Sequence, residues 1–277
     1  MDVGVVSRSF PQLSNKETAQ FLAKEGFKWT ELCFSQTDSN YWVYNGRSNL
    51  ETLTNKKSKE IIDIYQDHGI EVVAIGVFTN LLERSEKEAE ENLAYFQRLM
   101  EIASTNNIPY VSTECGFIPG KRGINADTYE SAFDLFKDRL GQLVQKAEEY
   151  HVSIALEPCV LDIIPSAKRT VDLIEQIGSS HLKVLLDPAN LIANHSEEDM
   201  FHYLSTHIAY FHGKDRKVND AYGRAIGDGD IDWPLFFQLY HQYTEGIPFI
   251  MEYVNIDNCC AIRDRVLQFN KEALATK

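Results

Sequence analysis

Short apolar segments recur along the chain and alternate with longer segments of mixed polarity. The short segments are rich in Val, Ile and Leu, and they cover residues 2–7, 28–35, 70–77, 108–116, 152–158, 182–188, 208–213 and 248–254. Near-continuous hydrophobicity over this length is typical of parallel β-strands that are buried on both faces. The pattern therefore predicts eight such strands.

The longer segments have the spacing of amphipathic helices. Residues 85–107 place apolar side chains three or four positions apart, residues 128–150 do the same, and residues 15–27 form a similar segment that ends around Gly26. Eight strands, each followed by a helix, close most economically into a (β/α)8 barrel. A doubly wound open sheet is the alternative, but the stretch "VVSRSFPQLS" lacks the glycine-rich phosphate turn that would favour it.

The composition narrows the class of protein. No Pro/Gly-rich linker or charge block divides the chain, so we expect residues 1–277 to form one domain. The net charge of −14 argues against binding to nucleic acid or to anionic membranes. The chain has five cysteines without a CxxC pair, no signal-like start and no membrane-length apolar segment, which together predict a cytoplasmic protein that handles small molecules.

The last four predicted strands end in ionisable residues: Glu157, Asp187, His212 and Glu252. The carboxyl ends of barrel strands carry the active site, so four adjacent strands would bring these groups to one point. Each residue alone could be a helix cap, an ion-pair partner or a core histidine. Three crowded carboxylates, however, need protons or a cation to neutralise them. The set predicts one divalent metal ion, with Mn²⁺, Mg²⁺ or Co²⁺ favoured by the oxygen donors and Zn²⁺ also compatible.

Five motifs occur in the order "ALEP", "LLDPANL", "YFHGKDR", "GDGDIDWPLFFQLY" and "FIMEY". With them the sequence resembles the sugar phosphate isomerase/epimerase family of xylose isomerase-like barrels over nearly the whole chain. The resemblance implies that Glu157, Asp187, His212 and Glu252 bind one divalent metal, and that Glu157 and Glu252 are also the catalytic acid/base pair. Dimers and tetramers are common in that family, so the resemblance also makes a homodimer or a homotetramer an expectation for this chain.

The implied reaction is isomerisation or epimerisation of a small ketose or ketose phosphate, by proton transfer next to the carbonyl through an enediolate. A dehydratase acting on an inosose or a similar polyhydroxy ketone is the alternative, because the same intermediate can expel a hydroxyl group. A non-catalytic sugar-binding barrel is a third hypothesis, and it would predict the loss of a ligand. Apurinic endonucleases of the same superfamily need further histidines after the second and third strands, which this sequence lacks.

The substrate is left open by departures from the free-ketose 3-epimerases. Those enzymes have a histidine where this chain has Asn190, a glutamate where it has Ile163 and an arginine where it has Val218. Asn190 can still orient a substrate hydroxyl or a metal-bound water through its amide, and we expect it to contact the substrate.

Three further residues are candidates for binding substrate. Lys214 and Arg216 could bind a hydroxyl, carboxylate or phosphate, or could instead pair with nearby aspartates at 215, 220 or 228. Glu114, at the end of the fourth strand, could face the pocket, as could Glu31 in the second, although core packing, capping or an ion pair would also explain either residue.

Overall fold

The computed structural model describes residues 1–123, 125–244 and 246–275. Eight parallel strands pair in sequence order, and β1 (Gly4–Val5) closes the circle against β8 (Phe249–Met251). The other strands are β2 (Trp29–Leu32), β3 (Glu71–Gly76), β4 (Tyr110–Glu114), β5 (Ser153–Glu157), β6 (Leu182–Leu186) and β7 (Ile208–Gly213). The predicted (β/α)8 barrel is confirmed, and every predicted strand segment contains a strand.

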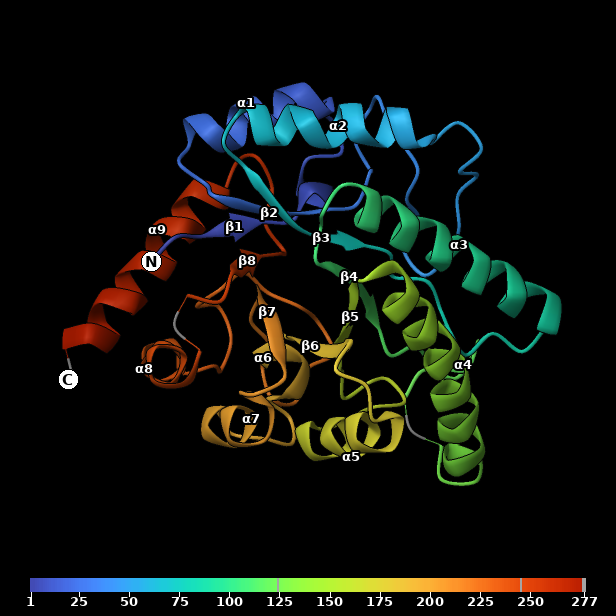
Figure 1. Cartoon of the computed structure of the whole chain (residues 1–277). Coiled ribbons are helices and arrows are strands. Elements are labelled where there is room, and N and C mark those ends of the chain that lie inside the picture. Colours follow the sequence, from blue (N-terminus) through green and yellow to red (C-terminus); the bar gives the residue numbers. More distant parts are fainter. Residues whose placement is uncertain (124, 245, 276–277) are drawn as a thin grey trace.

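The helices form a ring around the strands, and the N-terminus lies near α9, the last helix, at the left of the view in Figure 1. They are α1 (Asn15–Lys24), α2 (Asn55–Asp67), α3 (Glu86–Thr105), α4 (Tyr129–Tyr150), α5 (Ala167–Ile177), α6 (Pro188–Leu191), α7 (Glu197–Leu204), α8 (Trp233–Tyr243) and α9 (Cys259–Ala275). The first helix ends at Lys24, and Gly26 follows with a φ of 79°, so the predicted helix stop at Gly26 is confirmed. Two helices instead of one follow β6. None of the helices in the described residues is long and apolar enough to cross a lipid bilayer.

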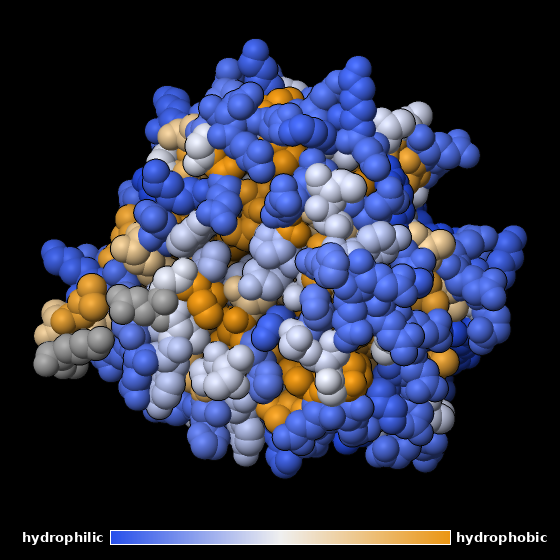
Figure 2. All heavy atoms as spheres, viewed as in Figure 1, coloured by the Kyte–Doolittle hydropathy of each residue, from blue (hydrophilic) through white to orange (hydrophobic). Residues whose placement is uncertain are grey.

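The buried apolar side chains form two hydrophobic cores, one on each side of the barrel wall. The larger one lies between strands and helices and includes Leu186, Phe211 and Met251, while a smaller one lies inside the barrel and includes Leu185 and Tyr210. Neighbouring residues join different cores because strand side chains alternate between the two faces. Hydrophilic side chains cover most of the face seen in Figure 2, as expected when helices turn their polar sides outward.

Gly4 allows the barrel to close. A Cβ atom at this position would lie 2.6 Å from both the carbonyl oxygen of Trp29 and the Cδ1 of Ile250. Both contacts are shorter than van der Waals separation, so β1 can sit between its two neighbours only with glycine there.

Candidate metal centre

The four ionisable strand-end groups point to the barrel axis, because each lies two positions after a residue of the inner core. The pairs are Ala155 and Glu157, Leu185 and Asp187, Tyr210 and His212, and Ile250 and Glu252. Side chains two apart on a strand share a face, so the ionisable groups form the layer above the inner core. One ligand atom from each lies within 4.8 Å of the others, and all four residues are buried.

A short helix orients Asp187. The residue caps α6, its Oδ1 accepts the Ala189 N–H at 2.9 Å, and Pro188 stands at the first helical position, where no N–H is needed. The other carboxylate oxygen, Oδ2, is then free to face the centre, where it pairs with the Lys214 ammonium. The local sequence "DPAN" thus sets the direction of this side chain.

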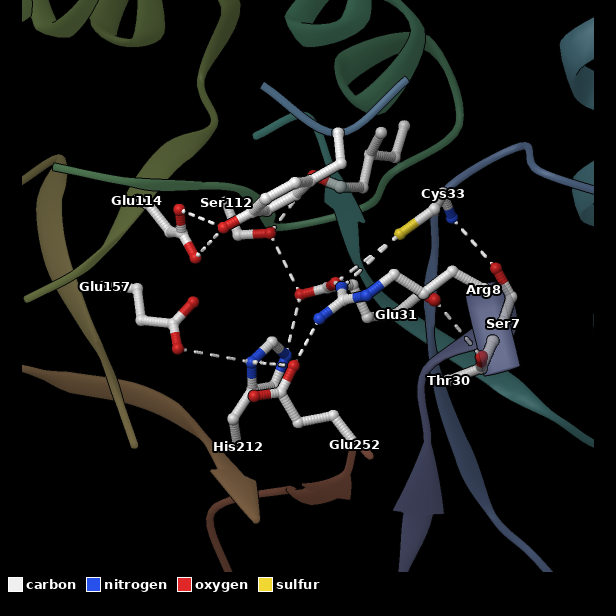
Figure 3. A network of polar contacts seen from close by, with 12 residues as sticks. Ser7, Arg8, Thr30, Glu31, Cys33, Ser112, Glu114, Glu157, His212 and Glu252 are labelled. Carbon is white, nitrogen blue, oxygen red and sulfur yellow. Dashed lines mark hydrogen bonds and ion pairs between the residues drawn. The ribbon is translucent and has the colours of Figure 1, made fainter. Parts of the chain in front are cut away.

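Glu31 orients the imidazole of His212 (Figure 3). Its Oε2 lies 3.1 Å from His212 Nε2 and also accepts hydrogen bonds from the hydroxyls of Ser112 and Tyr210. Burial alone would raise the pKa of Glu31, but His212, Arg8 and Tyr210 outweigh it and lower the pKa to about 2. An ionised carboxylate only accepts hydrogen bonds, so Nε2 must carry the hydrogen.

The other ring nitrogen of His212 is the one that could bind a metal. Nδ1 is buried, makes no hydrogen bond within the described part of the chain, and lies 3.7 Å from Glu157 Oε1 and 3.8 Å from Glu252 Oε2. Burial opposes the charged form, yet Glu31 and Glu252 raise the pKa of His212 to about 10. Metal binding at Nδ1 would therefore displace a proton.

Two cations lie among the carboxylates. The Lys214 ammonium pairs with Asp187 and Glu252 and lies 3.7 Å from Glu157 Oε1. Arg8 pairs with Glu31 at 3.0 Å and with Glu252. Burial would raise the pKa of Glu252, but Lys214, His212 and Arg8 lower it well below its usual range.

The charges and donor atoms of this cluster fit one divalent ion. A metal ligand set needs a neutral imidazole and ionised carboxylates, and in that state four carboxylates face two cations, so two negative charges are left for a divalent ion to neutralise. Burial raises the pKa of Asp187 to about 8, with Lys214 opposing and Glu252 and Glu157 adding to the effect. The buried group contains three carboxylates and one imidazole nitrogen that has no hydrogen-bond partner among the described residues. This is a donor set that could hold a metal.

Asn190 links the cluster to Arg216. Its amide Nδ2 donates to Glu157 Oε1 at 2.7 Å, and its Oδ1 accepts from Arg216 Nη2 at 3.4 Å. The alternative prediction, that the side chains of Lys214 and Arg216 pair with the aspartates at 215, 220 or 228, is not borne out among the described residues. The aspartates at 220 and 228 pair with Arg224 and Arg265.

Asp215 holds the loop that carries Lys214 and Arg216. Its buried carboxylate accepts hydrogen bonds from the Arg216 N–H at 2.8 Å, the Gly227 N–H at 2.9 Å and the Trp233 indole at 2.8 Å. A Cβ atom on Gly229 would lie only 2.1 Å from Asp215 Oδ1. The motif "GDGDIDW" is therefore the part of the sequence that closes around this aspartate.

Glu114 lies opposite Glu157 in the register of β4 and β5. The Tyr44 hydroxyl contacts both of its oxygens, at 2.9 and 2.8 Å, which brings the loop 38–49 to the centre. Burial, together with Glu157 and Asp162, raises the pKa of Glu114 to about 7. From the same side, the Phe78 ring stacks on His212 with 6.4 Å between centroids.

Sequence reasoning missed what Glu31 and Arg8 do. It considered an ion pair for Glu31, and the pair with Arg8 exists, but it did not foresee the contact with His212. The signal available in the sequence was the charged Glu31 in the middle of segment 28–35, which was predicted to be a buried strand. The structure shows its neighbours Thr30 and Leu32 to be fully buried.

Comparisons with known proteins agree with this fold. No curated protein matches the chain. Among solved structures, a D-tagatose 3-epimerase-like protein is 16% identical (TM-score 0.79; 100% of this chain and 99% of that one). The 3-keto-D-glucoside 4-epimerase YcjR from E. coli is 15% identical (TM-score 0.78; 98% of this chain and 99% of that one). The IOLI protein with a bound zinc atom is 17% identical (TM-score 0.72; 100% of this chain and 97% of that one). Residues 19–274 match the family model for xylose isomerase-like TIM barrels, and the chain belongs to that family.

Proposed function

We propose that this protein is a divalent-metal-dependent isomerase or epimerase that acts on a small ketose or ketose phosphate. The observation that carries the proposal is the buried cluster of Glu157, Asp187, His212 and Glu252, in which the imidazole Nδ1 faces two of the carboxylates and has no hydrogen-bond partner in the described residues. The fold shared with a solved epimerase and with an epimerase-like protein supports it. We place the enzyme in the cytoplasm, as a homodimer or homotetramer.

In this proposal the four residues of the cluster are the metal ligands. Mn²⁺, Mg²⁺ or Co²⁺ suits the three oxygen donors, and Zn²⁺ is compatible with the set. Once bound, the ion supplies a Lewis acid that polarises the substrate carbonyl and so acidifies the neighbouring C–H bond.

Glu157 and Glu252 are proposed as the acid/base pair because they come from β5 and from the end of β8, at the two flanks of the cluster. Lys214 and Arg8 contact Glu252 and keep it ionised, the state in which a carboxylate can accept a proton from the carbon next to the carbonyl. Asn190 holds Glu157 by one oxygen, so the other can return a proton from the opposite side. The substrate then passes through an enediolate, and inversion or carbonyl migration results.

Lys214, Asn190, Arg216 and Glu114 surround the cluster and are proposed to bind the substrate. The Phe78 ring stacks on His212, and the Trp42 ring packs against Phe78 with 6.4 Å between centroids, so these rings are proposed to exclude water from the reacting carbons.

The test is proton exchange in D2O. We expect the metal-loaded protein to incorporate deuterium next to the carbonyl of at least one member of a panel of ketoses and inososes, without loss of water from the product. A product lighter by one water would identify a dehydratase, and no exchange with any member would contradict the proposal.

The matched variants are Glu252→Gln and Glu71→Gln. The first removes the proposed base, and we expect it to lower the exchange rate by about 10² to 10⁴ at saturating metal. The second makes the same change on an exposed residue at the start of a barrel strand and is expected to have no effect. A Glu252→Gln protein with full turnover would remove the assigned role.

A further inference from the structure

Arg216 is a buried cation that forms no ion pair with any carboxylate in the described part of the chain. The residue is 5% exposed, and its Nε and Nη1 atoms have no hydrogen-bond partner among the described residues. Among the described residues, its side chain makes one hydrogen bond, of 3.4 Å, from Nη2 to Asn190 Oδ1. The neighbouring cations differ, because Lys214 and Arg224 both pair with carboxylates.

Such a guanidinium needs an anion from outside the chain. Arginine cannot give up its proton in a protein, so it cannot relieve the cost of burial by becoming neutral. A buried charge that lacks a partner destabilises the fold. The planar donor set of arginine matches carboxylate and phosphate oxygens in particular.

The position of Arg216 shows which molecule would bring that anion. Asn190 contacts both Arg216 and Glu157, so a single amide side chain separates the guanidinium from the cluster. Asp215 fixes the loop at this place through the Arg216 backbone N–H. An anion bound there would be within a few bonds of carbons held at the cluster.

We propose that the substrate carries an acidic group, a carboxylate or a phosphate, and that Arg216 binds it. This inference rests on the proposed function and narrows its substrate class to acidic polyhydroxy ketones. The protein as a whole has a net charge of −14 and repels anions, so an acidic substrate requires a local cation of this kind.

A binding experiment tests the site without turnover. Metal-loaded protein is titrated calorimetrically with inorganic phosphate and, separately, with malonate. We expect saturable binding of at least one probe, and the stronger one distinguishes a phosphate site from a carboxylate site. Arg216→Gln should weaken that binding at least tenfold, whereas Arg216→Lys should weaken it less. Lys217→Gln, which removes the same charge from an exposed neighbour, should change it less than twofold.

Absence of binding for both probes, or equal binding by wild type and Arg216→Gln, would overturn the inference. So would parallel weakening by Lys217→Gln, because that would indicate general attraction to the loop rather than a site at Arg216.

A selectivity experiment tests the role in the reaction. Deuterium exchange is followed for pairs of ketoses that differ only in the acidic group, such as fructose and fructose 6-phosphate. Arg216→Gln should lower kcat/KM for the acidic member about 100-fold, mainly through KM, and the loss for the neutral member should be at least tenfold smaller. Equal losses for both members, or a wild type that prefers the neutral one, would contradict the inference. If no ketose exchanges at all, the proposed function fails while the titrations still test Arg216.

Discussion

The state of the His212 ring depends on a residue that would not itself touch a metal. Glu31 accepts the hydrogen of Nε2, and its own negative charge is held by Arg8 at 3.0 Å and by the Ser112 hydroxyl at 3.0 Å. Partners of this kind fix the tautomer and direction of a ligand histidine and increase its basicity. Glu31 is therefore a positioning residue.

Glu31→Gln should weaken metal binding about 10- to 100-fold, because the neutral amide fixes the imidazole less firmly and removes a nearby negative charge. Calorimetric titration of the metal-free protein with Mn²⁺ or Co²⁺ measures the change. The absorption bands of bound Co²⁺ should also shift if the geometry at His212 changes. Unchanged affinity and an unchanged Co²⁺ spectrum would show that Glu31 serves only to pack the barrel.

Glu114 makes the stability of the metal-free protein depend on pH. Its carboxyl group has an ordinary pKa of 4.5 and a pKa of about 7 in the folded state. Between these values the unfolded chain releases a proton that the folded chain keeps, so stability falls as the pH rises from about 4.5 to about 7. One pKa unit corresponds to about 1.4 kcal/mol, and solvent at this partly exposed group reduces the total to about 1–2 kcal/mol.

Glu114→Gln cannot ionise and should remove this loss. In urea unfolding of metal-free protein, the variant should match wild type within error at pH 4 and exceed it by about 1–2 kcal/mol at pH 8. The same difference in stability at both pH values would contradict the assignment.

At this scale, what could be predicted was the residue type at each strand end. A charged residue directly after a buried strand has a direction set by the alternation of side chains, so Glu157 and His212 could be placed on the axis from the sequence. The contact between Glu31 and His212 joins residues 181 positions apart and depends on the exact stagger of β2 and β7, which no local pattern encodes.

At the scale of elements, the loop between β7 and α8 is organised around the buried carboxylate of Asp215. This group accepts hydrogen bonds from the backbone N–H of Arg216, the backbone N–H of Gly227 and the indole of Trp233. Both ends of the loop are therefore fixed to one point. Lys214 and Arg216 flank that point and acquire their directions from it. The sequence showed the motif, but its role became clear only when the chain's return path was known.

Gly229→Ala tests this arrangement. The added Cβ would lie 2.1 Å from Asp215 Oδ1 and 2.5 Å from the Arg216 carbonyl oxygen, and neither atom can move without breaking other contacts. We expect a loss of about 1–3 kcal/mol in the free energy of unfolding, measured in urea.

Gly141→Ala is the matched control. Gly141 lies inside α4 with nothing within 4 Å of the new Cβ, so this variant should gain about 0.5–1 kcal/mol from the better helix former. Equal stability of Gly229→Ala and wild type would show that the loop is not clamped at Asp215.

At the scale of the whole molecule, the alternation of strand and helix patterns was enough to predict the barrel. Eight buried parallel strands have few ways to close, and right-handed crossovers leave little freedom in their order. Short helices were harder to predict. The helix α6 depends on the cap at Asp187 and on the proline after it, and its four residues are too few to show a hydrophobic periodicity.

Barrel closure also explains why four distant residues meet. Strands β5 to β8 are neighbours in the circle, so their carboxyl ends converge although Glu157 and Glu252 are far apart in the chain. The resulting excess of negative charge is the property on which the proposed chemistry rests.

The most direct test is an anomalous difference map from crystals grown with Mn²⁺. We predict one peak at about 2.0–2.4 Å from a ligand atom of each of Glu157, Asp187, His212 and Glu252, with His212 contributing Nδ1 and the Lys214 ammonium moved off Asp187 and Glu252. A map without a peak among these four residues, with Lys214 still paired to Asp187 and Glu252 at saturating Mn²⁺, would contradict the account.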